Sequence, residues 1–479
     1  MGGNSSAKNA IYYSVGEIVP RVVGFLLLPL YTRYLSSADF GILSYTNTFN
    51  LFLYTIGTLS LNSYALRFYF LKGREEQKDM LGTVAISIGI VNLLILGLAY
   101  LILPGAIDYY EIQVPWKPFF QLALITNFMD SFCIVPFVIY RVKGAAKKYV
   151  SLGISKTLCM AAITIYMVCY LKGGLEAYYW SQIIVHIPFT IIYIIILSHH
   201  VNYRFRWPIL KEGLNFSLPL IPASIGYILL NASDRIILER NVLMSELGVY
   251  NMAVTFSLAL GVVVQGMSRA FEPELYGRYE KVDYQDFLRK IKSLYFTIVV
   301  IGGLAISIFS KEVFVLMTSE QFHRGYIYCP ILVAMVCLQS MNNLYGMILS
   351  GDKRTKRQAV STIVGGCVSV VLNILLIPKF GIMMAACTQL LCMFVMTFIK
   401  ERSINKPRLT MGKELLVLVI MMTSSYLLYQ ILPSVNIISV FIKLMAWIVL
   451  TLLLMRAYGV SFYSIASMLG INIKIKNNE

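Results

Sequence analysis

The sequence predicts an all-α polytopic membrane protein with about fourteen transmembrane helices. Of its 479 residues, 58% are hydrophobic and 14% are charged, whereas a soluble domain carries about 25% charged residues. Apolar runs of about 20 residues recur along the whole chain, and such a run is long enough to cross a hydrocarbon core of about 30 Å as a helix. The runs do not alternate apolar and polar residues, which excludes a transmembrane β-barrel.

The first six spans make up the N-terminal part of the prediction. The first span is too long for the apolar region of a signal peptide, and no small-residue cleavage site follows it, so we expect it to remain as a helix. Basic loops follow the second and fourth spans, and the acidic stretch PGAIDYYEIQVP follows the third. The six spans are 11–33, 41–66, 81–103, 118–140, 150–171 and 177–198.

Eight further spans follow in the C-terminal part. Two of the links between them, at 378–381 and 432–435, are short enough for neighbouring spans to be merged into one. The eight spans are 214–236, 246–270, 290–309, 326–349, 359–378, 380–399, 412–432 and 436–456.

Lys and Arg are distributed unequally between the two sets of loops. The loops on the N-terminal side of the membrane hold 24 of them, and the opposite loops hold 7. By the positive-inside rule both termini are then cytoplasmic, which requires an even number of spans. Topology therefore explains most of the net charge of +17, and we do not expect nucleic-acid binding.

The sequence lacks the common catalytic motifs. No Walker A, HExxH or GxSxG pattern occurs, and the eight cysteines are spaced for neither a metal site nor a disulfide framework. We expect the cysteines to be buried small apolar residues. The sequence thus predicts neither an enzyme nor a cofactor. Without an ATPase domain, an ion gradient, the membrane potential or the substrate gradient must drive any transport.

An internal repeat relates the two halves of the chain. A shift of 207 residues places Gly41 on Gly248, and 65–81 on 272–288 without a gap. Six spans therefore recur in the same orientation, as in transporters built from parallel repeats. The predicted parts are an N-lobe (1–205), a C-lobe (206–405), and two additional helices with a cytoplasmic tail (406–479).

Three segments carry a family pattern. NASDRIILERNVLMSELGVYNMAVTF (231–256) resembles the end of the seventh helix and the start of the eighth in bacterial polysaccharide transporters of the O-antigen flippase type. YTRYLSSADFGILSY (31–45) resembles their first outer turn, and LNILLIPKFGIMMAACTQLL (372–391) resembles their hairpin of helices 11 and 12. The resemblance covers residues 8–400.

This resemblance implies two six-helix bundles around a central cavity, the fold of the multidrug, oligosaccharidyl-lipid and polysaccharide exporters. It implies a flippase that moves undecaprenyl-pyrophosphate-linked oligosaccharide across the bacterial inner membrane by alternating access, for surface polysaccharide assembly. Membrane lipid, a coupling ion (H⁺ or Na⁺), a polysaccharide polymerase and a chain-length regulator are the implied partners. Two alternatives stay open, namely a multidrug or cation extruder of the same fold and a non-transporting assembly factor.

Glu17 and Arg21 place opposite charges within the first span. Arg21 lies about 15 Å into the helix, where an arginine costs roughly 2.5–3.5 kcal/mol, and Glu17 lies one turn away on the same face. The repeat-related positions are Ser224 and Ile228, so the shared fold does not require the pair. It is either structural or a cavity-lining cation for the pyrophosphate, which guanidinium groups bind with bidentate hydrogen bonds.

Other intramembrane charges are candidates for transport roles. Asp130 is either a coupling-ion site or a partner of Arg21 or Lys156. Lys156 and Arg269 either line the cavity as cations or extend to the cytoplasmic interface. His186 is expected to be a satisfied core histidine.

Further polar residues complete the predicted site. Asp234 and Arg235 are expected to form an outer gate or a helix cap. Side chains for sugar contacts are expected among Asn47, Asn50, Tyr54, Asn62, Asn127, Asn231, Asn251 and Gln265.

A cytoplasmic gate is also predicted from the repeat. Arg67 and Glu274 occupy equivalent positions with opposite charge, and residues related by a two-fold axis meet when they lie close to that axis. We expect Arg67 to pair with Glu274, together with Glu272, when the cytoplasmic side is closed. The alternative is local pairing, of Glu274 with Arg278 at i, i+4.

Overall fold

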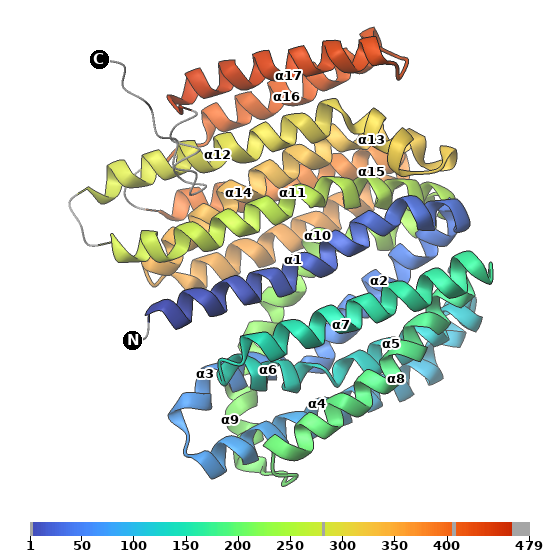
Figure 1. The fold of residues 1–479 in the computed structure, drawn as a ribbon, viewed down its shortest axis with the longest axis vertical. Helices are drawn as coiled ribbons and strands as arrows, with labels where there is room; N and C mark the ends of the chain where they lie inside the picture. Colours follow the sequence, from blue (N-terminus) through green and yellow to red (C-terminus); the bar gives the residue numbers. More distant parts are fainter. Residues whose placement is uncertain (1–2, 280–282, 405–408, 462–479) are drawn as a thin grey trace. The chain divides into compact units, whose positions relative to one another are not determined.

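The computed structural model describes residues 3–279, 283–404 and 409–461, and all regular elements within them are helical. By internal contacts the chain divides into two compact units, 1–248 and 249–479, and each is described by itself (Figure 1). Parts of the expected basic loops 277–292 and 400–413, and the tail beyond 461, lie outside the described residues. The lobes expected from the sequence repeat, 1–205 and 206–405, have boundaries that differ from those of these two units. The lobes therefore remain a prediction from the repeat.

The first unit is a bundle of helices joined by short turns. Several of the expected spans are built from two helices or from a helix and a short turn. The helices are α1 (Gly3–Tyr34), α2 (Ser37–Thr58), α3 (Leu61–Phe68), α4 (Arg74–Tyr109), α5 (Gln121–Ser131), α6 (Ile134–Val142), α7 (Ala146–Thr164), α8 (Gly174–His200), α9 (Trp207–Ser217), α10 (Ile221–Asn241) and the start of α11 (Met244–Gly277). Short turns lie at η1 (Tyr69–Leu71), η2 (Trp116–Phe120), η3 (Ile165–Tyr170) and η4 (Leu218–Leu220).

The break between α2 and α3 was not expected, because 41–66 was predicted as one helix. Leu59 and Ser60 adopt left-handed backbone angles, with φ of 47° and 53°. A break inside a span frees backbone carbonyls that need new donors in the absence of water. Asn92 supplies one, because its Nδ2 donates to the Gly57 carbonyl over 3.1 Å, and the Ser217 hydroxyl donates to the Ser60 carbonyl over 3.2 Å.

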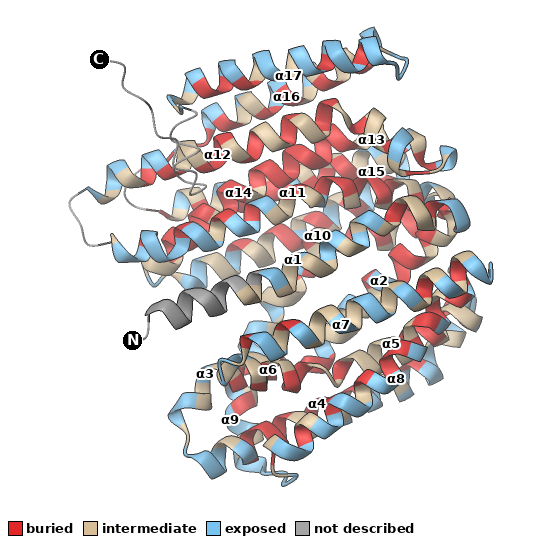
Figure 2. Ribbon diagram, in the orientation of Figure 1, coloured by how far each residue is buried: buried red, intermediate tan, exposed pale blue. Residues whose placement is uncertain are grey.

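The second unit surrounds a deeply buried helix. Nearly every residue of α14 (Cys329–Gly351) is buried (Figure 2), because α12, α15 and α16 all pack against it. The other elements are the rest of α11, α12 (Tyr284–Ile308), α13 (Ser310–Met317), η5 (Glu320–Tyr328), α15 (Thr355–Ser403), α16 (Gly412–Ile431) and α17 (Ile437–Tyr458).

Twelve helical stretches among the described residues are long and apolar enough to cross a membrane, two fewer than the fourteen predicted. One difference is α15, which counts once although Gly381 interrupts it with φ 68° and ψ −153°. The other is α2, whose sequence interleaves Thr and Asn with apolar residues and does not count. The protein is a multi-pass, all-helical membrane protein, and the number fourteen remains a prediction.

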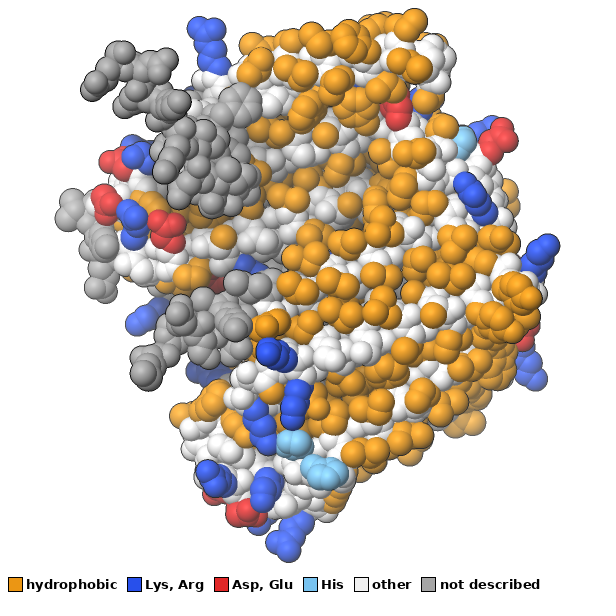
Figure 3. Space-filling view, in the orientation of Figure 1, with side chains coloured by type: hydrophobic (Ala, Val, Ile, Leu, Met, Phe, Trp, Pro, Cys, Tyr) orange, Lys and Arg blue, Asp and Glu red, His pale blue; other side chains and the backbone are white. Residues whose placement is uncertain are grey.

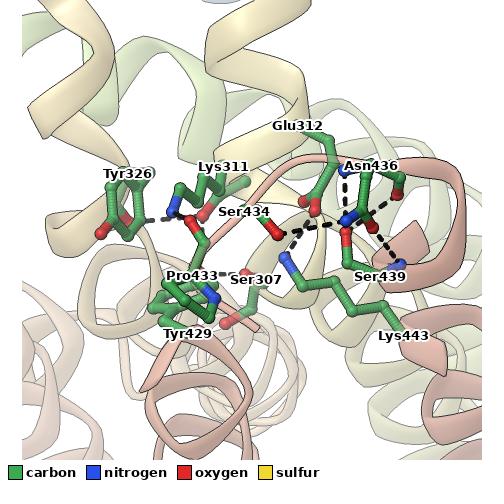
Figure 4. Close-up of polar contacts among 11 residues, drawn as sticks. Ser307, Lys311, Glu312, Tyr326, Tyr429, Pro433, Ser434, Asn436, Ser439 and Lys443 are labelled. Atoms are coloured by element: carbon green, nitrogen blue, oxygen red, sulfur yellow. Dashed lines mark hydrogen bonds and ion pairs between the residues drawn. The ribbon is translucent and has the colours of Figure 1, made fainter. Parts of the chain in front are cut away.

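Polar contacts attach the last two helices to the rest of the second unit. The Lys443 ammonium of α17 is fully buried and lies 2.6 Å from Glu312 of α13 (Figure 4). The Tyr429 hydroxyl of α16 lies 2.6 Å from that of Ser310. The visible face of this helix pair is covered by hydrophobic side chains (Figure 3). The pair therefore has a polar seam toward α12 and α13 and an apolar face suited to lipid.

The cysteines are only partly as expected. All eight are free, and Cys329, Cys337 and Cys392 are buried. Cys159 of α7 and Cys367 of α15 are exposed instead, because they lie on outward faces of apolar helices, where lipid can surround a thiol.

Two glycines mark a reciprocal contact within the first unit. A Cβ atom on Gly41 would lie 2.0 Å from the Met244 carbonyl oxygen, and one on Gly248 would lie 1.8 Å from the Ser37 carbonyl oxygen. Ser37 and Met244, like the two glycines, are 207 positions apart. Such reciprocity is the signature of a two-fold relation, and here it is local to the first turns of α2 and α11.

Replacing Gly41 with alanine is expected to destabilise the protein, because the methyl group would meet backbone that cannot rotate away. Overpacking of this kind costs about 1–3 kcal/mol. Gly24→Ala on α1 is the matched control, because nothing lies within 4 Å of a Cβ there. Thermal unfolding of the purified variants tests this, and equal melting temperatures for the two would contradict the close contact.

Candidate functional site

Three charged or titratable side chains meet between helices of the first unit. Asp130 is next to the last residue of α5, Lys156 lies in α7 and His186 lies in α8. The Lys156 Nζ is 2.5 Å from the Asp130 Oδ1, and the His186 Nε2 is 3.3 Å from the same oxygen. We call these three residues the Asp130 cluster.

The position of Asp130 explains why it needs cations. A carboxylate near the C-terminal end of a helix is repelled by the helix dipole, and an acidic group inside a membrane protein is costly without a partner. The Lys156 and His186 side chains are 17% and 7% exposed, whereas that of Asp130 is 40% exposed. The carboxylate thus keeps an open side while its cationic partners are largely buried.

The hydrogen bonds restrict the charge state of the cluster. The His186 Nδ1 is 2.7 Å from the Gln182 carbonyl oxygen, so this nitrogen must donate. The Nε2 faces the Asp130 carboxylate, which accepts hydrogen bonds when ionised and donates only when protonated. The contact is favourable only if a second proton sits on His186 or on Asp130. The arrangement can therefore hold a proton between two side chains.

The cluster resolves one alternative of the sequence analysis. Asp130 was expected either to be a coupling-ion site or to pair with Arg21 or Lys156, and the structure shows the contact with Lys156. His186 is buried and satisfied, as expected, but sequence spacing did not indicate that it lies beside Asp130. The described residues contain no group of three or more His, Cys, Asp or Glu side chains that could hold a metal ion.

Arg21 and Glu17 lie on α1, which continues through Pro20 without a break. Gly16 faces α7, because a Cβ atom there would lie 2.9 Å from the Val150 Cγ2. Arg21 is exposed and Glu17 is half-buried. Five residues correspond to about 140° around a helix, so Arg21 points away from α7.

The two residues of the predicted cytoplasmic gate each have a contact within their own unit. The Arg67 guanidinium of α3 stacks on the Phe216 ring of α9, 5.4 Å from its centroid. Glu274 of α11 pairs with Arg278 at 3.3 Å, which is the local pairing considered as the alternative. Glu272 accepts a hydrogen bond from the Tyr276 hydroxyl at 3.3 Å.

The remaining predicted residues are divided between buried and exposed positions. Asp234 and Arg235 are buried near the end of α10 and lie 3.4 Å apart. Arg269 of α11 is exposed. Among the sugar candidates, Asn50 and Asn231 use their amide groups to donate to backbone carbonyls, over 3.1 and 2.7 Å.

One buried carboxylate was missed by the sequence analysis. Glu239 of α10 is 1% exposed and accepts a hydrogen bond of 2.6 Å from the Gln113 backbone amide. The Gln113 side chain also donates to the carbonyl oxygens of Glu239 and Val242. The loop after α4 is thus tied to the end of α10. The repeat places Arg240, the next residue, at the position equivalent to Arg33. This equivalence is a sequence signal that could have drawn attention to the end of α10.

Structural comparisons identify the fold. The chain is similar to the lipid II flippase MurJ in an inward closed conformation, with a TM-score of 0.73, 14% identity, and coverage of 93% of this chain and 99% of that one. It is similar to an inward-facing multidrug resistance transporter of the MATE family, with a TM-score of 0.63, 13% identity, and coverage of 86% and 98%. Because both sequence identities are low, these likenesses establish the fold alone.

The fold is thus the one that the lipid II flippase MurJ and the MATE-family transporter share. The chain belongs to the polysaccharide biosynthesis protein family, whose sequence model matches residues 6–273. Among curated proteins it is 25% identical over 324 residues to Lsg locus putative protein 1 of Haemophilus influenzae, covering 66% of this chain and 77% of that protein. It is 24% identical over 287 residues to an uncharacterized membrane protein of the same species, covering 58% and 67%.

Proposed function

We propose that the protein is a flippase for undecaprenyl-pyrophosphate-linked oligosaccharide. It would carry this substrate from the cytoplasmic to the outer leaflet of a bacterial inner membrane by alternating access, with both termini cytoplasmic. Fourteen spans, arranged as two six-helix bundles around a cavity with two added helices, complete the proposal. Membership of the polysaccharide biosynthesis protein family is the observation that carries it, and a polymerase and a chain-length regulator are its proposed partners.

The exposed arginine of α1 supports an anionic substrate. An arginine in mid-span is costly in lipid, whereas in an aqueous cavity it can bind a pyrophosphate bidentately. Arg67, Lys156 and Arg269 are proposed as further cations along the path.

A multidrug or cation extruder of the same fold is the alternative transporter. Such a pump needs a carboxylate that is available to a cationic drug. Asp130 is instead bound to Lys156 at 2.5 Å. The charge distribution of the first unit therefore favours an anionic substrate.

The Asp130 cluster supports coupling to protons. A hard cation such as Na⁺ is held by oxygen ligands, whereas Asp130 is contacted by two nitrogen groups. Displacing a proton from this cluster would change the interactions among α5, α7 and α8, which is how an ion gradient can bias a conformational equilibrium.

Deleting the gene tests the function directly. We expect undecaprenyl-linked repeat units to accumulate on the cytoplasmic leaflet and surface polysaccharide to be lost, with both restored by the wild-type gene. Unchanged polysaccharide with increased drug sensitivity would instead identify an extruder. Loss of polysaccharide with repeat units already on the outer leaflet would identify an assembly factor.

A charge-swap series tests the proposed pairing of Arg67 with Glu274. Arg67→Glu and Glu274→Arg should each impair export, because like charges would then face each other, and the double reversal should recover part of it. Arg289→Glu, at an exposed position of α12, is the control for an added acidic group. If the single variants export normally, or the double variant is no better than the worse single one, the local contacts are the whole role of these residues.

A further inference from the structure

A polar cavity of about 210 Å³ lies among α11, α14 and α15 of the second unit. A second hollow of about 490 Å³ shares two of its walls, Tyr276 and Ser350, so the two form one groove. It lies near the loops 277–292, 352–357 and 400–413, which the charge distribution predicts to be cytoplasmic. The inner cavity is lined in part by Ser268, Glu272, Asn343, Gln358 and Lys400.

Lys400 lies at the inner end of the groove and is poorly satisfied. Its side chain is on α15, only 4% of the residue is exposed, and among the described residues its one hydrogen bond is 3.4 Å long, to the Asn342 carbonyl oxygen. An ammonium group has three donors, and burying it without partners is unfavourable. The two remaining donors are therefore available to a ligand in the cavity.

Gln358 places a second donor beside the ammonium. Its Oε1 accepts a hydrogen bond of 3.1 Å from the Ser350 hydroxyl, which leaves the amide NH₂ directed elsewhere. A Cβ atom on Gly346 would lie 3.3 Å from the Gln358 Nε2 and 3.5 Å from the Lys400 Nζ. Both donors therefore converge over a glycine, where the missing side chain leaves room for another group.

The acidic residue of the cavity lies on the exposed side. Glu272 is exposed and is held by the Tyr276 hydroxyl at 3.3 Å, whereas the cation is buried. A cavity with a buried cation and amide donors is suited to an anion, and a carboxylate at the rim weakens the binding of every anion that passes it.

The outer hollow is suited to a sugar. Its walls include Tyr276 and Tyr279, the backbone of Gly277 and Gly351, and Lys353. Tyrosine rings offer an apolar face and a polar edge, and a Cβ atom on Gly277 would meet nothing within 4 Å, so a ligand can approach the backbone there. The Tyr279 phenol donates to Asp352, and this hydrogen bond raises its pKa to about 12, so the phenol stays neutral beside the acid.

We infer that this groove binds a phosphorylated sugar, with the phosphate on Lys400 and Gln358 and the sugar against Tyr276. The phosphate could belong to a lipid-linked glycan or to a soluble sugar nucleotide, and both share this chemistry. The lipid-linked source rests on the proposed function and would make the groove a loading site at the cytoplasmic ends of the helices. The soluble source would make it a regulatory site.

Binding to the purified full-length protein in nanodiscs tests the inference by calorimetry. The probes are inorganic pyrophosphate, geranyl pyrophosphate and uridine diphosphate glucose. We expect Lys400→Gln to weaken binding of the preferred probe roughly tenfold or more, as the loss of a charge-assisted hydrogen bond should. Lys356→Gln, which removes an exposed lysine of the same helix, should leave binding unchanged.

Two further variants guard against effects on folding. Gly346→Ala keeps the charge but fills the space between the donors, so it should weaken binding while the protein stays folded, since alanine favours a helix over glycine. Glu272→Gln should strengthen binding several-fold, because it removes a repulsive charge. A purely structural role of Lys400 predicts no such gain.

The outcomes distinguish the two sources of the phosphate, and they distinguish the proposed groove from the proposed flippase function. Preference for geranyl pyrophosphate supports the lipid-linked source, and preference for the sugar nucleotide supports the soluble one. Binding of no probe, or equal affinity of Lys400→Gln and the parent protein, overturns the site. These measurements do not depend on transport, so a negative binding result does not affect the gene-deletion test of the flippase. A negative deletion test, in turn, does not contradict a site for a soluble ligand.

Discussion

Replacing Arg21 with alanine is expected to reduce export of the lipid-linked oligosaccharide roughly tenfold or more, the effect of removing a charge-assisted hydrogen bond to a desolvated anion. The protein should still fold, because Arg21 is exposed. Arg21→Lys should recover only part of the activity, because an ammonium lacks the planar fork that binds phosphate bidentately. Surface polysaccharide and lipid-linked intermediates in a complemented deletion strain provide the measurement.

The matched control for Arg21 is its neighbour on the same helix. Val22 is also exposed, at 45%, so Val22→Ala removes side-chain volume from the same region without removing charge. Normal export by both alanine variants, at equal protein levels, would show that Arg21 is not an essential substrate contact.

Asp130→Asn is expected to abolish transport and to destabilise the first unit. The change leaves the buried Lys156 ammonium without its carboxylate. Breaking a fully buried pair costs about 3–5 kcal/mol, and we expect about 1–3 kcal/mol here because the Asp130 side chain is 40% exposed and partly screened. Thermal unfolding measures the stability, and proton movement coupled to substrate in proteoliposomes measures the function.

A double variant separates the two roles of Asp130. Asp130→Asn combined with Lys156→Gln removes both charges, so stability should return close to that of the parent protein, since a neutral pair leaves no buried charge unpaired. If Asp130 holds the coupling proton, the double variant stays inactive. Recovery of export together with stability would show that the pair is only structural.

The fold class followed from the sequence, because length and hydrophobicity act locally. A run of about 20 apolar residues has few alternatives to a membrane helix, and the loop charges set its orientation. The breaks within spans did not follow. Leu59 and Ser60 leave the helix although neither is Gly or Pro. The break is stabilised by Asn92 of another helix, which no local pattern reveals.

The reciprocal glycine contact shows what a repeat adds. The shift of 207 marked Gly41 and Gly248 as equivalent. Only the fold shows that Gly41 lies against the Met244 carbonyl oxygen and Gly248 against the Ser37 carbonyl oxygen. Equivalence is a property of sequence, whereas contact depends on how near the two segments lie to the axis that relates them.

The sequence by itself determined which residues carry charge inside the membrane, and it drew attention to Asp130, Lys156 and Arg21. Only the tertiary structure decided that Asp130 binds Lys156 at 2.5 Å, that His186 of a third helix completes the cluster, and that Lys400, assigned to a loop, is buried at the end of a cavity. The physical reason is that the cost of an intramembrane charge can be read from its residue type and depth. Its partner is set by helix packing, which joins residues distant in the chain.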